Sequence, residues 1–154
     1  MNLKRNENDE ELIKKYFFKL SIPPSVNSLY NSAYRNGKIV FYMNNKAKEA
    51  KDVLMMEIKV QALQNKCPKF KDKIVILEMI PVNMKKGRDT NNLYKLLNDA
   101  FQDSGIIDND KNIIERTLRL EYDNKKESYL KVWLFEAKGS PSIEDIKEYF
   151  FWNK

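Results

Sequence analysis

The stretch from Thr90 to Ser104 has the most regular apolar pattern in the chain. At about 100° per residue its apolar and polar side chains fall on two separate helical faces. Asp89 or Thr90 can cap its N-terminus, and Gly105 follows the last periodic residue, where a left-handed stop is favourable. The pattern predicts an amphipathic helix over about 90–104. Its apolar face is Leu93, Leu96, Leu97, Ala100 and Phe101, and its polar face is Asn91, Asn92, Lys95, Asn98 and Asp99.

Charged side chains are concentrated in the sequence immediately before and immediately after this helix. Bases precede it, and Gly105 with two isoleucines turns the chain back towards acids that precede an apolar run at Ile113. Divalent cations bind oxygen ligands and phosphates bind cations, so this mixture favours a metal-dependent nuclease. If the helix start packs beside the next strand, Asp89 and Asp110 converge on one ion. The bases are Lys85, Lys86 and Arg88, and the later polar residues are Asp108, Asn109 and Asp110.

The remaining apolar patterns predict strands and one further helix. The helix begins with a cap at Asn44 or Asn45 and ends near Asn65, with a lysine-rich outer face. Its apolar positions are Ala47, Ala50, Val53, Leu54, Ile58, Ala62 and Leu63. Strands are expected at Lys15–Ser21, Ile39–Met43, Lys73–Pro81, Ile113–Tyr122 and Tyr129–Phe135.

Two turns connect these strands in the prediction. Asp123–Lys126 makes a hairpin of the last two strands, and Asn36-Gly37-Lys38 is a hairpin turn that brings Tyr42 near a loop containing Tyr30 and Tyr34. Two helices and a set of strands with alternating patterns indicate an α+β fold. We expect a single domain with one mixed β-sheet covered by two helices.

Two motifs in the chain resemble the RusA family of Holliday junction resolvases. Family members carry D-x-D-N-x-x-K, then D-A-L, then a glycine and a D-D pair before a strand. Residues 89–110 follow this spacing without a gap, and PPSVNSLY at residues 23–30 is similar to the family's P-P-S-x-N-x-x-Y signature. Both motifs lie within residues 16–136, the stretch over which the resemblance extends. The matching downstream positions are Asp89, Asn91, Asn92, Lys95, Asp99, Ala100, Phe101, Gly105, Asn109 and Asp110.

The resemblance implies an activity and its site residues. It implies an endodeoxyribonuclease that resolves four-way junctions and branched DNA by paired symmetric nicks, in recombination and repair, as a homodimer. The metal ligands would be Asp89, position 91 and Asp110, with Asp108 as a further candidate, and Lys95 would be the catalytic lysine. The cofactor would be Mg²⁺, with Mn²⁺ as a substitute.

The chain departs from the family pattern at two positions. Asn91 stands where the family usually has Asp, and Asn109 replaces the first Asp of the pair. A unit charge about 4 Å from another contributes roughly 4 kcal/mol at an effective dielectric of 20, before desolvation. We therefore expect weaker metal binding. One alternative is a junction-binding protein that no longer cuts DNA. The other is a generic basic nucleic-acid-binding module whose acidic residues form only a solvated surface.

The charge balance is compatible with a nucleic-acid partner. The net charge is +6 and the pI about 9.2. We expect Lys85, Lys86 and Arg88 to contact phosphates, with Asn27 and Tyr30 nearby, and we interpret the other lysine clusters as solubilising charge. The sequence contains no histidine, which excludes nucleases that use histidine as their base. Lys95 would stabilise negative charge on the phosphate.

The chain is expected to contain one nuclease domain and a short extension. Residues 1–137 form the RusA-like domain, and 138–154 form a helical extension that docks on it or on a second subunit. Base stacking by Phe151 or Trp152 is the alternative for this aromatic tail. No apolar run approaches a membrane span, the start is unlike a signal peptide, and Cys67 has no disulfide partner. We expect a cytoplasmic protein.

Overall fold

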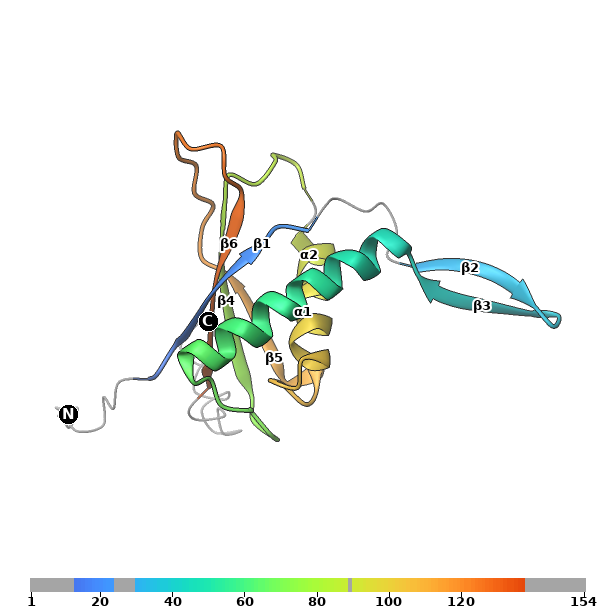
Figure 1. Cartoon of the computed structure of the whole chain (residues 1–154), viewed down its shortest axis with the longest axis horizontal. Helices are drawn as coiled ribbons and strands as arrows, with labels where there is room; N and C mark the ends of the chain where they lie inside the picture. The colour runs from blue at the N-terminus through green and yellow to red at the C-terminus, as the bar shows by residue number, and fades with distance from the viewer. Residues whose placement is uncertain (1–12, 24–29, 89, 138–154) are drawn as a thin grey trace, which may run out of the picture.

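The computed structural model describes residues 13–23, 30–88 and 90–137, and two helices lie on one face of a mixed sheet (Figure 1). The elements run in the order β1 (Tyr16–Ser21), β2 (Tyr30–Arg35), β3 (Lys38–Met43), α1 (Asn45–Asn65), β4 (Val75–Val82), α2 (Thr90–Asp103), a 3₁₀ turn (Asp110–Asn112), β5 (Ile113–Thr117) and β6 (Tyr129–Glu136). The predicted α+β fold is confirmed. The expected C-terminal extension, 138–154, lies outside the described residues.

The four-stranded sheet has the order β1-β6-β4-β5. β6 pairs antiparallel with both β1 and β4, whereas β4 and β5 are parallel. The predicted hairpin of residues 113–122 with 129–135 is therefore wrong, because β4 lies between these two strands. Parallel neighbours need a crossover connection, and α2 supplies it between β4 and β5. This crossover sets the positions of the two ends of α2.

β5 is shorter than the sequence pattern predicts. β5 ends at Thr117. The residues beyond it that were predicted to continue the strand are exposed: Leu118 is 42% exposed, Leu120 47% and Tyr122 54%. After Thr117 the chain no longer pairs continuously with β4. It forms only isolated backbone hydrogen bonds with the end of β4. The Glu121 N–H donates to the Pro81 carbonyl at 3.0 Å, and the Asn83 N–H donates to the Glu121 carbonyl at 2.8 Å. The alternating pattern marked a sheet edge rather than a longer core strand.

The core lies between the sheet and the two helices. All five residues of the predicted apolar face of α2 are buried, together with Tyr94 and Asn98. Phe101 meets Phe18 of β1 edge to face, with ring centroids 5.3 Å apart. Leu130, Val132 and Leu134 alternate inward from β6 and are fully buried. Burial of this apolar face fixes α2 on the sheet.

α1 begins where the sequence predicts, because the Asn44 side chain accepts from the Lys46 N–H at 2.9 Å. Ala47, Ala50, Leu54, Ile58 and Ala62 are buried. Val53 and Leu63 were predicted to join them, but they are 50% and 82% exposed. They lie instead on the outer face with Met56 and Val60, so that face carries apolar residues beside its exposed lysines.

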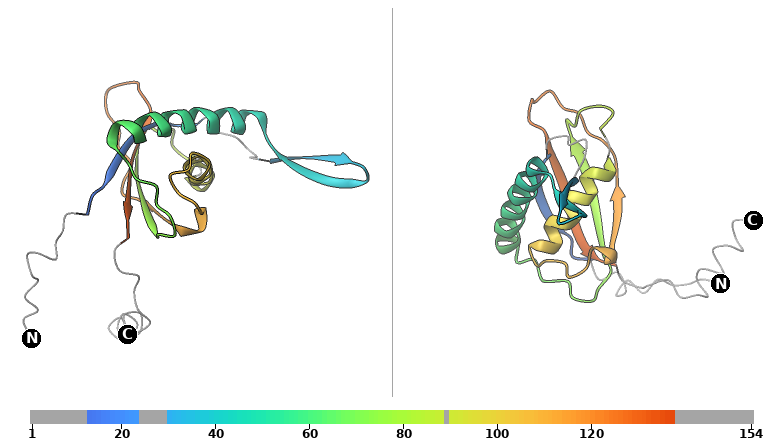
Figure 2. Two further views of the ribbon diagram at one scale, coloured as in Figure 1. Left: turned by 60° about the horizontal axis from the view of Figure 1, so that its bottom comes forward. Right: turned by 90° about the vertical axis from the view of Figure 1, so that its right-hand side faces the viewer.

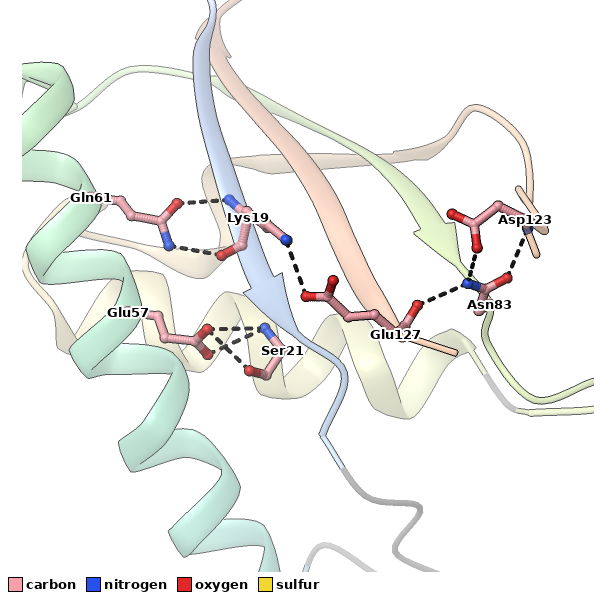
Figure 3. A network of polar contacts seen from close by, with 7 residues as sticks. All are labelled: Lys19, Ser21, Glu57, Gln61, Asn83, Asp123 and Glu127. Atoms are coloured by element: carbon pink, nitrogen blue, oxygen red, sulfur yellow. Dashed lines mark hydrogen bonds and ion pairs between the residues drawn. The ribbon is translucent and has the colours of Figure 1, made fainter. Parts of the chain in front are cut away.

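Polar side chains of α1 cover the free edge of β1 (Figure 3). The Lys19 N–H donates to Gln61 Oε1, and Gln61 Nε2 donates back to the Lys19 carbonyl, each at 2.7 Å. One turn earlier, Glu57 accepts from the Ser21 N–H at 3.2 Å and from Ser21 Oγ at 3.0 Å. An edge strand with unpaired amides is a site for unwanted pairing, and these bonds protect it.

β2 and β3 form a separate two-stranded hairpin, hereafter the arm. Asn36 and Gly37 have φ angles of +52° and +73°, as a tight hairpin turn requires, so the predicted turn is confirmed. The predicted loop containing Tyr30 and Tyr34 is wrong, because these residues belong to strand β2. The arm extends past the N-terminal end of α1, away from the sheet (Figure 2, left).

Candidate nucleic-acid and metal site

The basic loop is residues 85–88, between β4 and α2. Lys85, Lys86, Gly87 and Arg88 line a pocket of about 330 Å³. Gly87 has a φ angle of +79°, which a glycine adopts without strain. Both lysines are exposed, whereas Arg88 is half-buried and burial lowers the pKa of its guanidinium. An arginine remains charged under these conditions, so the loop presents three cations before the N-terminus of α2.

Asn83 anchors the start of this loop (Figure 3). Its backbone is left-handed, with a φ angle of +54°. Its Nδ2 donates to Asp123 Oδ1 at 2.7 Å and to the carbonyls of Lys125 and Glu127 at 2.9 and 2.8 Å, and its Oδ1 accepts from the Asp123 N–H at 2.9 Å. Asn83 thus joins the end of β4 to the connection before β6. Sequence reasoning missed this role, although asparagine tolerates a left-handed backbone better than most residues other than glycine.

The first turns of α2 carry two of the predicted site residues. Asn91 and Lys95 are both exposed and lie one turn apart, on the polar face that the sequence predicts. A helix N-terminus attracts anions through its free N–H groups and its dipole. The end of α2 next to the basic loop therefore has the features of a phosphate-binding surface. Asp89, the residue between the loop and the helix, lies outside the described residues.

The acidic stretch after α2 is tied to other parts of the chain. The Asp110 N–H donates to Gln102 Oε1 at 3.1 Å, and Asn109 Oδ1 accepts from the Lys111 N–H at 3.0 Å as the cap of the 3₁₀ turn. Asp108 Oδ2 accepts from the Asp72 N–H at 3.0 Å. The Asp108 carboxylate therefore holds the segment that precedes β4. Asp110 lies beside the last turn of α2.

Asn91 and Asp110 lie towards opposite ends of α2. Tyr94 Oη and Thr117 Oγ1 are 2.6 Å apart, and Asn98 Nδ2 donates to Glu115 Oε1 at 2.6 Å, so α2 runs antiparallel to β5. Asn91 and Gln102 are separated by about 16 Å along the helix axis at 1.5 Å per residue. The expected convergence of position 91 and Asp110 on one ion is therefore not found within one chain.

A second charged group surrounds the C-terminal half of α2. Lys51 Nζ of α1 contacts Asp103 Oδ2 at 2.8 Å, and this hydrogen bond raises the lysine pKa. Burial raises the pKa of Asp99, Lys51 opposes that shift, and the Asp103 and Asp110 carboxylates add to it. Asp99 therefore interacts electrostatically with Lys51 and with Asp110, towards the C-terminal end of α2. Sequence reasoning could not find Lys51, because only the packing of α1 on α2 brings it here.

Asn91, Asp110 and the further candidate Asp108 lie within the described residues, whereas the expected ligand Asp89 lies outside them. Within residues 13–23, 30–88 and 90–137, no three acidic, cysteine or histidine side chains are grouped so that they could hold a metal ion. Among the other predicted contacts, Asn27 lies outside the described residues. Tyr30 is placed by its backbone opposite Met43 at the base of the arm.

No protein-family model matches this chain, and no curated protein matches it significantly. None of the helices in the described part of the chain is long and apolar enough to cross a membrane. The family resemblance therefore rests on the residues of the two sequence motifs.

Proposed function

We propose that this protein is an endodeoxyribonuclease that acts on four-way junctions and other branched DNA. The observation that carries the proposal is the basic loop Lys85–Arg88, whose pocket lies directly before the α2 turns that hold Asn91 and Lys95. The downstream RusA-like motif, from Asp89 to Asp110, begins directly after this loop. Loop cations would hold the phosphates of the DNA, and the N-terminus of α2 would favour their negative charge.

Lys95 is the residue proposed to act on the reacting phosphate. Its side chain is exposed one turn from Asn91, so it can approach a phosphate bound at the start of α2. A fixed ammonium group there would stabilise the negative charge that develops during hydrolysis.

The proposed Mg²⁺ cofactor, with Mn²⁺ as a substitute, fits the structure only in part. A divalent ion bound beside the phosphate lowers the pKa of its water and neutralises charge. Asp89 and the Asn91 carbonyl have suitable donor chemistry at the start of α2. Within one chain Asp110 and Asp108 lie towards the other end of α2, where the Asp110 N–H donates to Gln102 and Asp108 accepts from the Asp72 N–H. The proposed ligands at the start of α2 are therefore Asp89 and Asn91.

Paired symmetric nicks also imply two copies of the chain. One small domain with one site makes one nick at a time, whereas a twofold dimer presents two equivalent sites to the junction. A homodimer is therefore part of the proposal.

The phosphate-binding role of the loop is tested by replacing Lys85 and Lys86 together with alanine. Junction affinity should fall, and the slope of log K against log salt should become shallower by roughly two, since each phosphate contact contributes about one. Fluorescence anisotropy with a labelled junction at several salt concentrations measures both quantities.

The matched control replaces Lys69 and Lys71, which are exposed before β4. These lysines lie at the end of the sheet opposite the basic loop, next to the Phe70–Ile107 bridge. Their removal should leave the salt slope nearly unchanged. Equal losses in the two double variants would show that general positive charge, rather than the basic loop, holds the DNA.

The second candidate function is junction binding without cleavage. Two observations favour it: Asn91 replaces the usual Asp, and Asp110 lies towards the other end of α2. Such a protein would retard a four-way junction in a gel in Mg²⁺ without releasing product. Restoring the carboxylate with Asn91→Asp would then convert binding into cutting if charge at this position is what is missing.

A further inference from the structure

The arm exposes a row of large apolar side chains. Tyr34 and Ile39 are paired across β2 and β3, and Phe41 follows Ile39 by two residues, so all three share one face. Their exposed fractions are 78%, 56% and 73%. β2 and β3 contact each other, and neither packs extensively on another described element. An isolated two-stranded hairpin is at best marginally stable in water, so the arm needs a surface to pack on.

The outer face of α1 carries a second apolar row, hereafter the outer stripe. It consists of Val53, Met56, Val60 and Leu63, spaced three, four and three residues apart. This spacing keeps them on one side of the helix, opposite the buried row that contains Leu54 and Ile58. Met56 and Leu63 are 69% and 82% exposed, and both valines are 50% exposed. Such a contiguous exposed row typically marks an interaction surface.

We propose that the arm of one chain packs on the outer stripe of a second copy of this chain, and that the second arm does the same in return. The arm extends beyond the N-terminal end of α1, so it points away from the stripe of its own chain (Figure 2, left). If two chains are related by a twofold axis near the N-terminal ends of their α1 helices, the arm of each chain lies along the α1 helix of its partner. Two identical contacts then close the assembly as a dimer.

The two surfaces match in length and in area. Six-residue strands extend about 20 Å, and the stripe from residue 53 to 63 is about 15 Å long. Side chains of this kind expose on the order of 100 Å² each here, so arm and stripe together offer roughly 700 Å² per copy. A standard stable interface buries about 600–1,000 Å² per partner. The exposed apolar area is therefore sufficient for a stable dimer.

The requirement for two copies rests on the proposed nuclease function, whereas the surface is inferred from exposure and geometry alone. The test is therefore made without DNA, so a failure of cleavage leaves it unaffected. Sedimentation velocity of the wild-type chain should give the mass of two chains. Met56→Lys with Leu63→Lys should raise the dimer dissociation constant at least about 100-fold, because two central apolar contacts become charges.

The matched control is Leu118→Lys with Leu120→Lys, which changes exposed apolar residues after β5. It should remain dimeric, and far-ultraviolet circular dichroism should show that both double variants stay folded. A monomeric wild type, or equal effects of the two double variants, would overturn the proposal.

Cross-linking provides a second readout that does not depend on destabilising the dimer. Chains with Phe41→Cys and chains with Met56→Cys, each also carrying Cys67→Ser, are mixed and oxidised. A covalent dimer should form in the mixture, whereas Phe41→Cys mixed with Leu120→Cys should stay uncoupled. If Ile39→Ser with Phe41→Ser weakens DNA binding and leaves the mass unchanged, the arm contacts DNA and the dimer surface is wrong.

Discussion

Junction cleavage should fall at least about 100-fold when Lys95 is replaced by alanine, because a positioned charge at a reacting phosphate typically contributes that much to the rate. Lys95 is exposed on α2, one turn after Asn91, and the basic loop directly precedes this helix. Junction affinity should change much less, because three loop cations remain. Single-turnover cleavage of a labelled four-way junction, together with its dissociation constant, separates the two effects.

Two variants make the Lys95 experiment specific. Lys95→Arg keeps the positive charge and should retain part of the rate, although the planar guanidinium will not occupy the same position. Lys59→Ala removes an exposed lysine from α1 and should leave both rate and affinity nearly unchanged. If Lys95→Ala cleaves at the wild-type rate, Lys95 is only a solvated lysine on the polar face of α2.

Phe101→Ala should lower the free energy of unfolding by about 3–5 kcal/mol, the usual cost of deleting a buried aromatic ring. Phe101 is fully buried and its ring lies against Phe18, so the substitution leaves a cavity between α2 and β1. Urea denaturation followed by circular dichroism measures the change. Leu120→Ala, at a residue that is 47% exposed, should stay within about 0.5 kcal/mol of the wild type. A loss below 1 kcal/mol for Phe101→Ala would mean that this part of the core is not packed as described.

Local patterns predicted the elements that depend on short-range chemistry. The two faces of α2 follow from its periodicity, the start of α1 from the Asn44 cap, and the arm's turn from Asn36-Gly37. In each case neighbouring residues determine the backbone conformation. The outer stripe was missed because α1 has apolar residues on two opposite faces, which weakens the contrast that marks an amphipathic helix.

Strand order could not be predicted, because it depends on contacts between distant segments. Residues 113–122 and 129–135 are joined by a turn sequence, and neighbouring strands usually pair. Here β4 inserts between them, and β5 pairs parallel to β4 at the sheet edge. The alternation after Ile113 contains no information about which strand lies beside it.

The same topology explains why the candidate site was predicted only in part. The basic loop and the polar face of α2 are local, and the structure places them together at one end of the helix. Asp110 comes just before β5, and a crossover helix runs antiparallel to the strand that follows it. Residues immediately before β5 therefore lie near the C-terminal end of α2, away from Asn91. Close spacing in sequence did not imply closeness in space.

The most direct test of the proposed function is cleavage of an end-labelled four-way junction by the wild-type chain in Mg²⁺ and in Mn²⁺, beside a linear duplex of the same sequence. We predict symmetric nicks in opposing strands of the junction, no cutting of the duplex, no product with Asp89→Asn, and faster cutting with Asn91→Asp. Binding of the junction without product in either metal, from the wild type and from Asn91→Asp alike, would contradict the assignment as a nuclease.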